Sequence, residues 1–185
     1  MSTREKILSV TAKIIASEGL DAVSIRYVCE KSEVKAPTVY YYFKDKDGLV
    51  DEVVRLAYVK YTKKHNAYIA DKDLRTMLVK SWDIFFDFVE VETDLFHAII
   101  LAHIKQKIPS EGMKLFLSIA EIFKSLEKIN KLALPYYTSA QIFYSTAYGM
   151  ALVYISQGKN SKLKNNIQLN RDLCIDSLIC CKRHS

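Results

Sequence analysis

The chain has 185 residues, which is enough for one or two domains with a buried core. Half of the residues are hydrophobic and 26% are charged, a balance typical of folded proteins. The net charge of +6 permits an anionic partner, such as a nucleic acid or an anionic membrane, but does not require one. No apolar run reaches roughly 18 residues, and the charged N-terminus makes a poor export signal. We therefore expect a cytoplasmic protein with no membrane span and with reduced cysteines.

Glycine and proline are scarce, with 5 and 3 residues in the whole chain. Sheet proteins need turn residues every few positions, so this scarcity favours long helices joined by short loops. Apolar residues recur with helical spacing along the chain and predict an all-α fold of about nine helices with no strand. The expected helices cover about residues 3–17, 25–31, 36–42, 46–65, 74–89, 95–104, 113–131, 138–156 and 167–181. The polar, basic stretch 159–166 is expected to be a loop.

Two of these helices are short and close together, which makes residues 25–42 a helix-turn-helix candidate. Ser24 is a good N-cap for the first, and Pro37 suits the first turn of the second. Val28, Val39 and Phe43, together with Val34, can share a small core with the helix at 3–17. The second short helix then exposes groups that can contact phosphates, base edges and thymine methyls in a major groove: Lys35, Ala36, Thr38, Tyr40 and Tyr42.

Lys46 stands at the start of the next helix, where free N–H groups and the helix dipole favour a phosphate. Tyr40, Tyr41 and Tyr42 have an alternative interpretation as ordinary core aromatics of a helical bundle. Three consecutive residues of one short helix cannot all face inward, however, so we favour contact with DNA. Bulk charge does not support this choice, since residues 1–50 carry 8 basic and 7 acidic side chains.

The stretch from about residue 3 to 55 resembles the N-terminal helix-turn-helix of the TetR family of bacterial transcriptional regulators. The resemblance is carried by Pro37-Thr38-Val39-Tyr40-Tyr41-Tyr42-Phe43, followed by Lys46 and Leu49. It implies a DNA-binding domain at 1–46 and a helical domain at 47–185 for ligand binding and dimerisation. It also implies DNA contacts at Ser24, Arg26, Lys35, Thr38, Tyr40, Tyr42 and Lys46.

Glu33 departs from the family pattern, because the turn between the two short helices usually holds glycine. If this residue is left-handed, its side chain costs roughly 1 kcal/mol.

The resemblance places a homodimer interface on the last two helices, about 138–156 and 167–181. Small side chains in the first of them, including Ala140, Ser145 and Gly149, would let helices approach closely. The alternative is that both helices pack only within one subunit.

Aromatic side chains in the middle of the chain predict an apolar chamber with a few polar groups, which is typical of a small-molecule site. The candidate ligand-binding residues are Trp82, Phe85, Phe86, Phe96, His97, His103 and Phe123. A plain aromatic core is the alternative. His97 and His103 are six residues apart and cannot aim at one metal ion from one helix. Asp94 and His97 have a spacing that is compatible with metal ligands and are the alternative. We favour no metal site and expect no cofactor beyond an unidentified small-molecule effector.

These features predict a ligand-responsive transcriptional repressor that binds a palindromic operator as a dimer and is released by a small-molecule inducer. Sequence motifs of common enzyme classes, such as G-x-S-x-G, H-E-x-x-H and the P-loop, are missing, so we expect no enzyme. One alternative is a redox-responsive regulator of the same fold, which would use Cys180 and Cys181 beside basic residues. The other is a helical adaptor that does not bind DNA.

Overall fold

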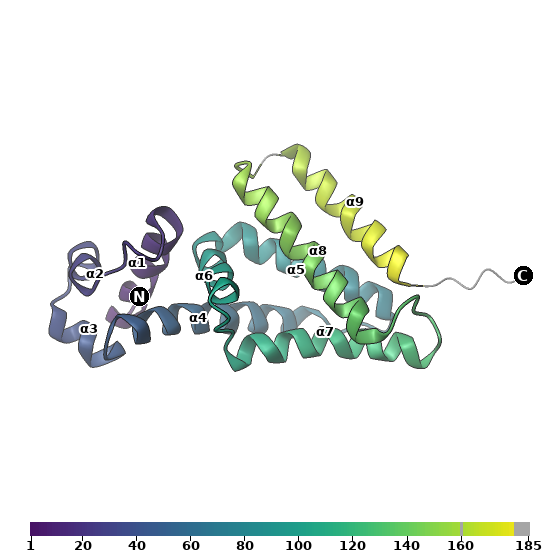
Figure 1. Ribbon diagram of the computed structural model, residues 1–185, viewed down its shortest axis with the longest axis horizontal. Coiled ribbons are helices and arrows are strands. Elements are labelled where there is room, and N and C mark those ends of the chain that lie inside the picture. The colour runs from purple at the N-terminus through teal and green to yellow at the C-terminus, as the bar shows by residue number, and fades with distance from the viewer. Residues whose placement is uncertain (160, 180–185) are drawn as a thin grey trace, which may run out of the picture. The chain divides into compact units, whose positions relative to one another are not determined.

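A computed structural model of the chain describes residues 1–159 and 161–179 (Figure 1). Across these residues there are nine helices and no strand, which confirms the predicted all-α fold. The helices are α1 (Thr3–Glu18), α2 (Ile25–Ser32), α3 (Ala36–Phe43), α4 (Lys46–Tyr68), α5 (Leu74–Val91), α6 (Thr93–Ile104), α7 (Ser110–Lys128), α8 (Tyr136–Ser156) and α9 (Ser161–Leu178). No helix in the described part of the chain is both long and apolar enough to cross a membrane.

The chain packs into two compact units. The first comprises residues 1–61 and 91–111 and holds α1, α2, α3, α6 and most of α4. The second comprises residues 62–90 and the described residues from 112 onward, with most of α5 and α7, all of α8, and α9. This packing does not test where a DNA-binding function ends, so the boundary at 46/47 stays a prediction.

Local signals set the helix starts of the first unit. Ser2 and Glu5 form a capping box at the start of α1, and the Ser24 hydroxyl accepts a hydrogen bond from the Tyr27 N–H at 3.2 Å. The Asp45 carboxylate accepts one from the Gly48 N–H at 2.8 Å, at the start of α4. Short polar side chains in these places satisfy N–H groups that lack an intrahelical partner, which explains why the starts could be predicted.

The core of the first unit lies under the two short helices. Val28 of α2 and Val39 and Phe43 of α3 are buried, as predicted, whereas Val34 is only partly buried. α1 packs against both α2 and α6, and Ile7 of α1 is fully buried. Burying an aliphatic side chain of this size stabilises the fold by about 1.5–3 kcal/mol.

The second unit is built on aromatic packing. Trp82 stacks on Phe86 at a centroid distance of 5.6 Å and meets the edge of Phe143 at 5.5 Å. Phe143 contacts Phe123 at 5.7 Å. His65, near the end of α4, is buried, and its Nε2 lies 3.0 Å from the Ser81 hydroxyl. Burial lowers the pKa of His65, since the charged imidazolium would be desolvated there.

The start of α9 corrects one expectation. Residues 161–166 are helical, although the stretch 159–166 was predicted as a loop. Gly158 and Lys159 have positive φ angles of 72° and 57° and follow the end of α8, whereas lysine and asparagine are tolerated inside an exposed helix. Polarity indicated exposure here and was wrongly taken for irregular backbone. Lys164 pairs with Glu90 of α5 at 2.5 Å.

The turn between α3 and α4 is tight. Lys44 adopts a positive φ of 65°, and the Asp45 N–H donates to the Phe43 carbonyl at 2.7 Å. A Cβ atom at Gly48 would overlap that same carbonyl oxygen. Glycine at 48 therefore allows the first turn of α4 to lie against the end of α3.

Glu33→Gly should raise stability. Glu33 is left-handed, with φ 55° and ψ 39°, as the missing glycine suggested. Glycine removes the Cβ conflict, so we expect a gain of about 0.5–1 kcal/mol in the free energy of unfolding, measured by chemical denaturation. Glu33→Ala is the control, because it keeps the strain and loses the exposed ion pair with Lys6. A gain in the alanine variant equal to that in the glycine variant would contradict the argument.

Gly48→Ala should lower stability. The added methyl group must displace either the end of α3 or the start of α4, at a cost of about 1–3 kcal/mol. Thermal unfolding measures this loss, with Asp47→Ala in the same exposed turn as the matched control. Equal unfolding temperatures for wild type and Gly48→Ala would show that the turn is not tight.

Candidate nucleic-acid interface

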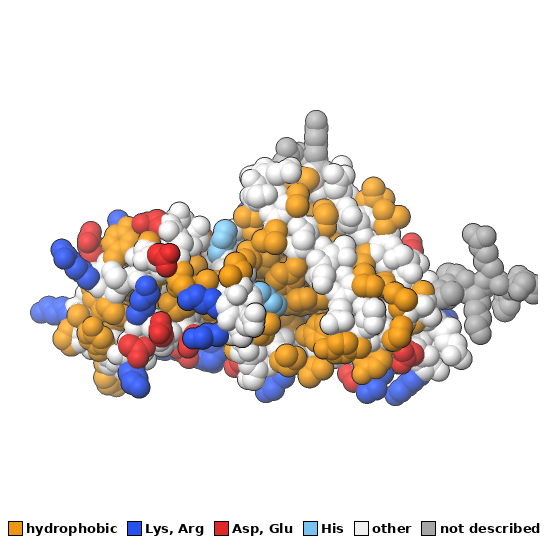
Figure 2. Space-filling view, viewed as in Figure 1, with side chains coloured by type: hydrophobic (Ala, Val, Ile, Leu, Met, Phe, Trp, Pro, Cys, Tyr) orange, Lys and Arg blue, Asp and Glu red, His pale blue; other side chains and the backbone are white. Residues whose placement is uncertain are grey.

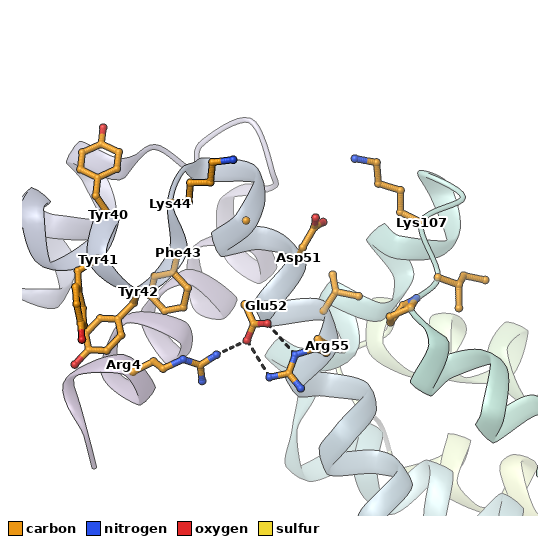
Figure 3. Close-up of a pocket in the computed structure, with 14 residues that line it drawn as sticks. Arg4, Tyr40, Tyr41, Tyr42, Phe43, Lys44, Asp51, Glu52, Arg55 and Lys107 are labelled. Atoms are coloured by element: carbon orange, nitrogen blue, oxygen red, sulfur yellow. Dashed lines mark hydrogen bonds and ion pairs between the residues drawn. The ribbon is translucent and has the colours of Figure 1, made fainter.

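Helix α3 has two contrasting sides. Val39 and Phe43 are buried, whereas Tyr40, Tyr41 and Tyr42 are 52%, 82% and 39% exposed. Figure 3 shows Tyr40 projecting to the opposite side of the helix from Tyr41 and Tyr42. The three tyrosines are therefore free to contact a partner and are not core aromatics.

All eight residues predicted to contact DNA lie at the surface of the first unit. Two are partly buried, Thr38 and Lys46, and the others are exposed: Ser24, Arg26, Lys35, Ala36, Tyr40 and Tyr42. They come from α3, from the residue before it, and from the starts of α2 and α4. Since Ser24 accepts a hydrogen bond through its oxygen, its hydroxyl hydrogen is left to donate.

Tyr41 was not among the predicted contacts, although it is the most exposed of the three tyrosines. Val39 and Phe43 are four residues apart, about one helical turn, and both face the core. Tyr41, midway between them, therefore points away from the core. The spacing of the buried pair was the signal that could have identified it.

An open groove of about 770 Å³ lies beside α3 (Figure 3). Its walls are the end of α3 with Lys44, the first turns of α4, the start of α1 with Arg4, and the loop 107–109. Arg4 and Arg55 both bond the Glu52 carboxylate at this groove. The hydrogen bond from Arg55, and then the charges of both arginines, hold the pKa of Glu52 below its ordinary value, so this carboxylate is ionised at neutral pH.

The predicted ligand-binding residues divide between the two units. Trp82, Phe85, Phe86 and Phe123 are buried in the second unit, and Phe96 is buried in the first. His97 and His103, both partly buried, also belong to the first unit. Their contact with a ligand stays a prediction.

Two of these residues have informative surroundings. The His103 Nε2 lies 3.2 Å from the hydroxyl of buried Tyr58, and burial lowers the pKa of His103. Phe86 lines a groove of about 300 Å³ in the second unit, together with Asp83, Tyr154 and Lys164.

The cysteines of the described residues are free thiols. Cys29 is partly exposed, and Cys174 is buried, which raises the pKa of its thiol. Cys180 and Cys181, on which the redox alternative depends, lie outside the described residues. Within those residues, no three His, Cys, Asp or Glu side chains gather into a metal-binding group.

Comparison with known proteins identifies the helix-turn-helix. Residues 7–53 match the family described as "Bacterial regulatory proteins, tetR family". The "Probable HTH-type transcriptional regulator YttP" of Bacillus subtilis is 30% identical over 63 residues, which cover 34% of this chain and 30% of that protein. The HTH-type transcriptional repressor KstR2 of Mycolicibacterium smegmatis is 32% identical over 54 residues, 29% of this chain and 26% of that protein. The chain thus matches less than a third of the length of these relatives.

Solved structures resemble the chain over nearly its whole length. The fatty acid degradation regulator FadR from Bacillus halodurans has a TM-score of 0.83 at 14% identity, covering 100% of this chain and 98% of that one. A TetR family transcription regulator from Marinobacter aquaeolei VT8 has a TM-score of 0.76 at 19% identity, covering 96% and 95%. At such identities the likeness shows the fold alone. Residues 7–53 are therefore a helix-turn-helix of the bacterial tetR family of regulatory proteins, within a chain that has the all-helical fold of TetR-family regulators.

Proposed function

We propose that this protein is a transcriptional repressor that binds a palindromic DNA operator as a homodimer and releases it when a small molecule binds. The observation that carries the DNA-binding part is the exposure of three consecutive tyrosines of α3, Tyr40, Tyr41 and Tyr42. Val39 and Phe43 anchor the same helix in the core. Aromatic side chains gathered at a surface mark a contact with a partner, and tyrosine adds a hydroxyl that can bond phosphates or base edges.

In this proposal α3 enters the major groove. Thr38 and Tyr40 contact base edges or the backbone, and Tyr41 joins them because of its exposure. Tyr42 and Lys46 hold phosphates, with Lys46 aided by the dipole at the start of α4. Ser24 donates its hydroxyl to a phosphate at the start of α2, while Arg26, Lys35 and Ala36 complete the contact surface.

An exposed apolar stripe on α8 and α9 supports the homodimer. Hydrophobic side chains reach the surface along α8 (Figure 2). The stripe consists of Ile142, Leu152 and Val153 of α8 and Leu169 and Leu173 of α9, which are 37%, 45%, 41%, 58% and 61% exposed. Two copies related by a two-fold axis would cover this stripe with itself and would present two α3 helices to the two halves of a palindrome.

Release by a small molecule requires that the ligand bind the DNA-free conformation more tightly than the DNA-bound conformation. A ligand bound among the predicted aromatic and histidine residues lowers operator affinity only if it prefers the released conformation. Helix α4 starts at Lys46 and continues into the second unit, so a shift of α4 would move a predicted phosphate contact. Because the operator of a bacterial regulator lies in the cytoplasm, the proposal places the protein there.

Lys46→Ala should weaken DNA binding and reduce its salt dependence. One lost phosphate contact lowers the slope of log affinity against log salt by about 0.9 per subunit. The probe is a double-stranded fragment that the purified protein selects from a pool of genomic fragments, measured by gel shift or anisotropy. Tyr40→Ala should weaken binding to the same fragment. The control is Lys63→Ala, because this lysine is exposed near the other end of α4 and is not a predicted contact.

Unchanged binding in both Lys46→Ala and Tyr40→Ala would refute the assigned contacts. Failure of the wild-type protein to retain any fragment would favour the helical adaptor instead.

Leu173→Asp should convert a dimer into a monomer, because a buried, unpaired carboxylate would stand in the proposed interface. Sedimentation velocity measures the change, and operator affinity should fall with it. Met113→Asp is the matched control, since Met113 is 51% exposed on α7 and lies outside the stripe. A wild-type monomer, or a Leu173→Asp dimer as stable as the wild type, would rule out this interface.

A further inference from the structure

We infer that Glu52 of α4 is a positioning residue for DNA binding, acting on the tyrosines of α3 through Arg4 of α1. This inference rests on the proposed function, since it assigns the residues that hold the reading helix in place. It is carried by a continuous series of contacts along the groove in Figure 3, all of them within the first unit.

The series begins on α4. Arg55 donates two hydrogen bonds to Glu52, from Nε at 2.8 Å and from Nη2 at 3.0 Å. This forked arrangement fixes the direction of the carboxylate. Glu52 also accepts a hydrogen bond from Nη2 of Arg4, which lies 48 residues earlier on another helix. The carboxylate therefore ties the start of α1 to the second turn of α4.

Arg4 then contacts α3. Its guanidinium carbon lies 5.5 Å from the centroid of the Phe43 ring, within the range of a cation–π interaction. The Phe43 ring is 5.9 Å from the Tyr42 ring, which in turn meets the edge of Tyr41 at 5.1 Å. The contacts thus lead from a charged residue of α4 to the two most C-terminal of the exposed tyrosines.

The effect of removing the negative charge of Glu52 distinguishes two possible roles of Arg4. A carboxylate near a surface that binds a polyanion should weaken binding, and removing it should help. If Arg4 instead contacts a phosphate directly, removal of Glu52 should also strengthen DNA binding, because the guanidinium would be freed. If Glu52 positions Arg4, its removal should weaken DNA binding, since Arg4 would no longer be held over Phe43. The sign of the effect therefore separates the two roles.

The test is Glu52→Gln with Asp51→Asn as its matched control. Both variants remove one negative charge from the same groove, but Asp51 forms no ion pair with any described residue. We expect Glu52→Gln to weaken binding to the selected DNA fragment about threefold per half-site, and so about tenfold for a dimer, with an unchanged salt slope. Asp51→Asn should bind as well as the wild type or better. Arg4→Met should behave like Glu52→Gln and also keep the wild-type salt slope.

Hydrogen exchange of the free protein gives a second readout that needs no DNA. The Lys44 N–H donates to the Tyr40 carbonyl at 3.0 Å, and amides of residues 40–44 should exchange several-fold faster in Glu52→Gln and Arg4→Met but not in Asp51→Asn. Unchanged exchange in this segment overturns the inference even if the wild-type protein binds no DNA, which would refute only the proposed function. Binding by Glu52→Gln as tight as that of Asp51→Asn overturns it as well, and a lower salt slope in Arg4→Met would reassign Arg4 to a phosphate contact.

Discussion

The burial of Val39 and Phe43 is the contact on which the proposed DNA-binding surface of α3 depends. Helix α3 has eight residues, and a helix of two turns is not stable in water by itself. Its conformation is therefore maintained by the two side chains, four residues apart, that it places in the core of the first unit. The same spacing forces the residues between them outward, so the exposure of three consecutive tyrosines follows from the core contact.

The turns before and after α3 carry backbone strain that this core contact must offset. Glu33, which ends α2, and Lys44, which ends α3, have positive φ angles without being glycine, each at a cost of roughly 1 kcal/mol. Only the first could be anticipated, because the resemblance identified a turn that usually holds glycine. The second lies in the turn where α4 approaches the end of α3 closely at Gly48, and no local sequence pattern specifies its conformation.

Local chemistry explains how much of the fold was predictable. Caps such as Ser24 and Asp45 act within three residues, so the starts of α2 and α4 could be read directly. The start of α9 could not, because a polar helix and a polar loop have similar composition when no breaker separates them.

The site was predictable to a similar extent. The outward side of α3 was identified from short-range pattern, with Tyr41 left out. The groove beside it was not, since Arg4, Glu52 and the loop at 107 come from three separate parts of the chain. For the same reason, the predicted ligand-binding residues were identified as aromatic and buried, but their division between two units could not be foreseen.

Helix α9 shows how the fold of the second unit and the proposed dimer can depend on one element. Ile175 and Leu178 are buried and anchor it within its own chain, and charged residues pair it with α5, as in the 2.7 Å contact of Arg171 with Asp83. Exposed ion pairs of this kind stabilise the fold by only about 0–1 kcal/mol each, so they help to orient α9 but contribute little to its stability. Covering Leu173 in a dimer would contribute about 1.5–3 kcal/mol, comparable to a core contact. Because the anchoring and the apolar stripe use different residues of α9, association can change while the core of the subunit stays intact.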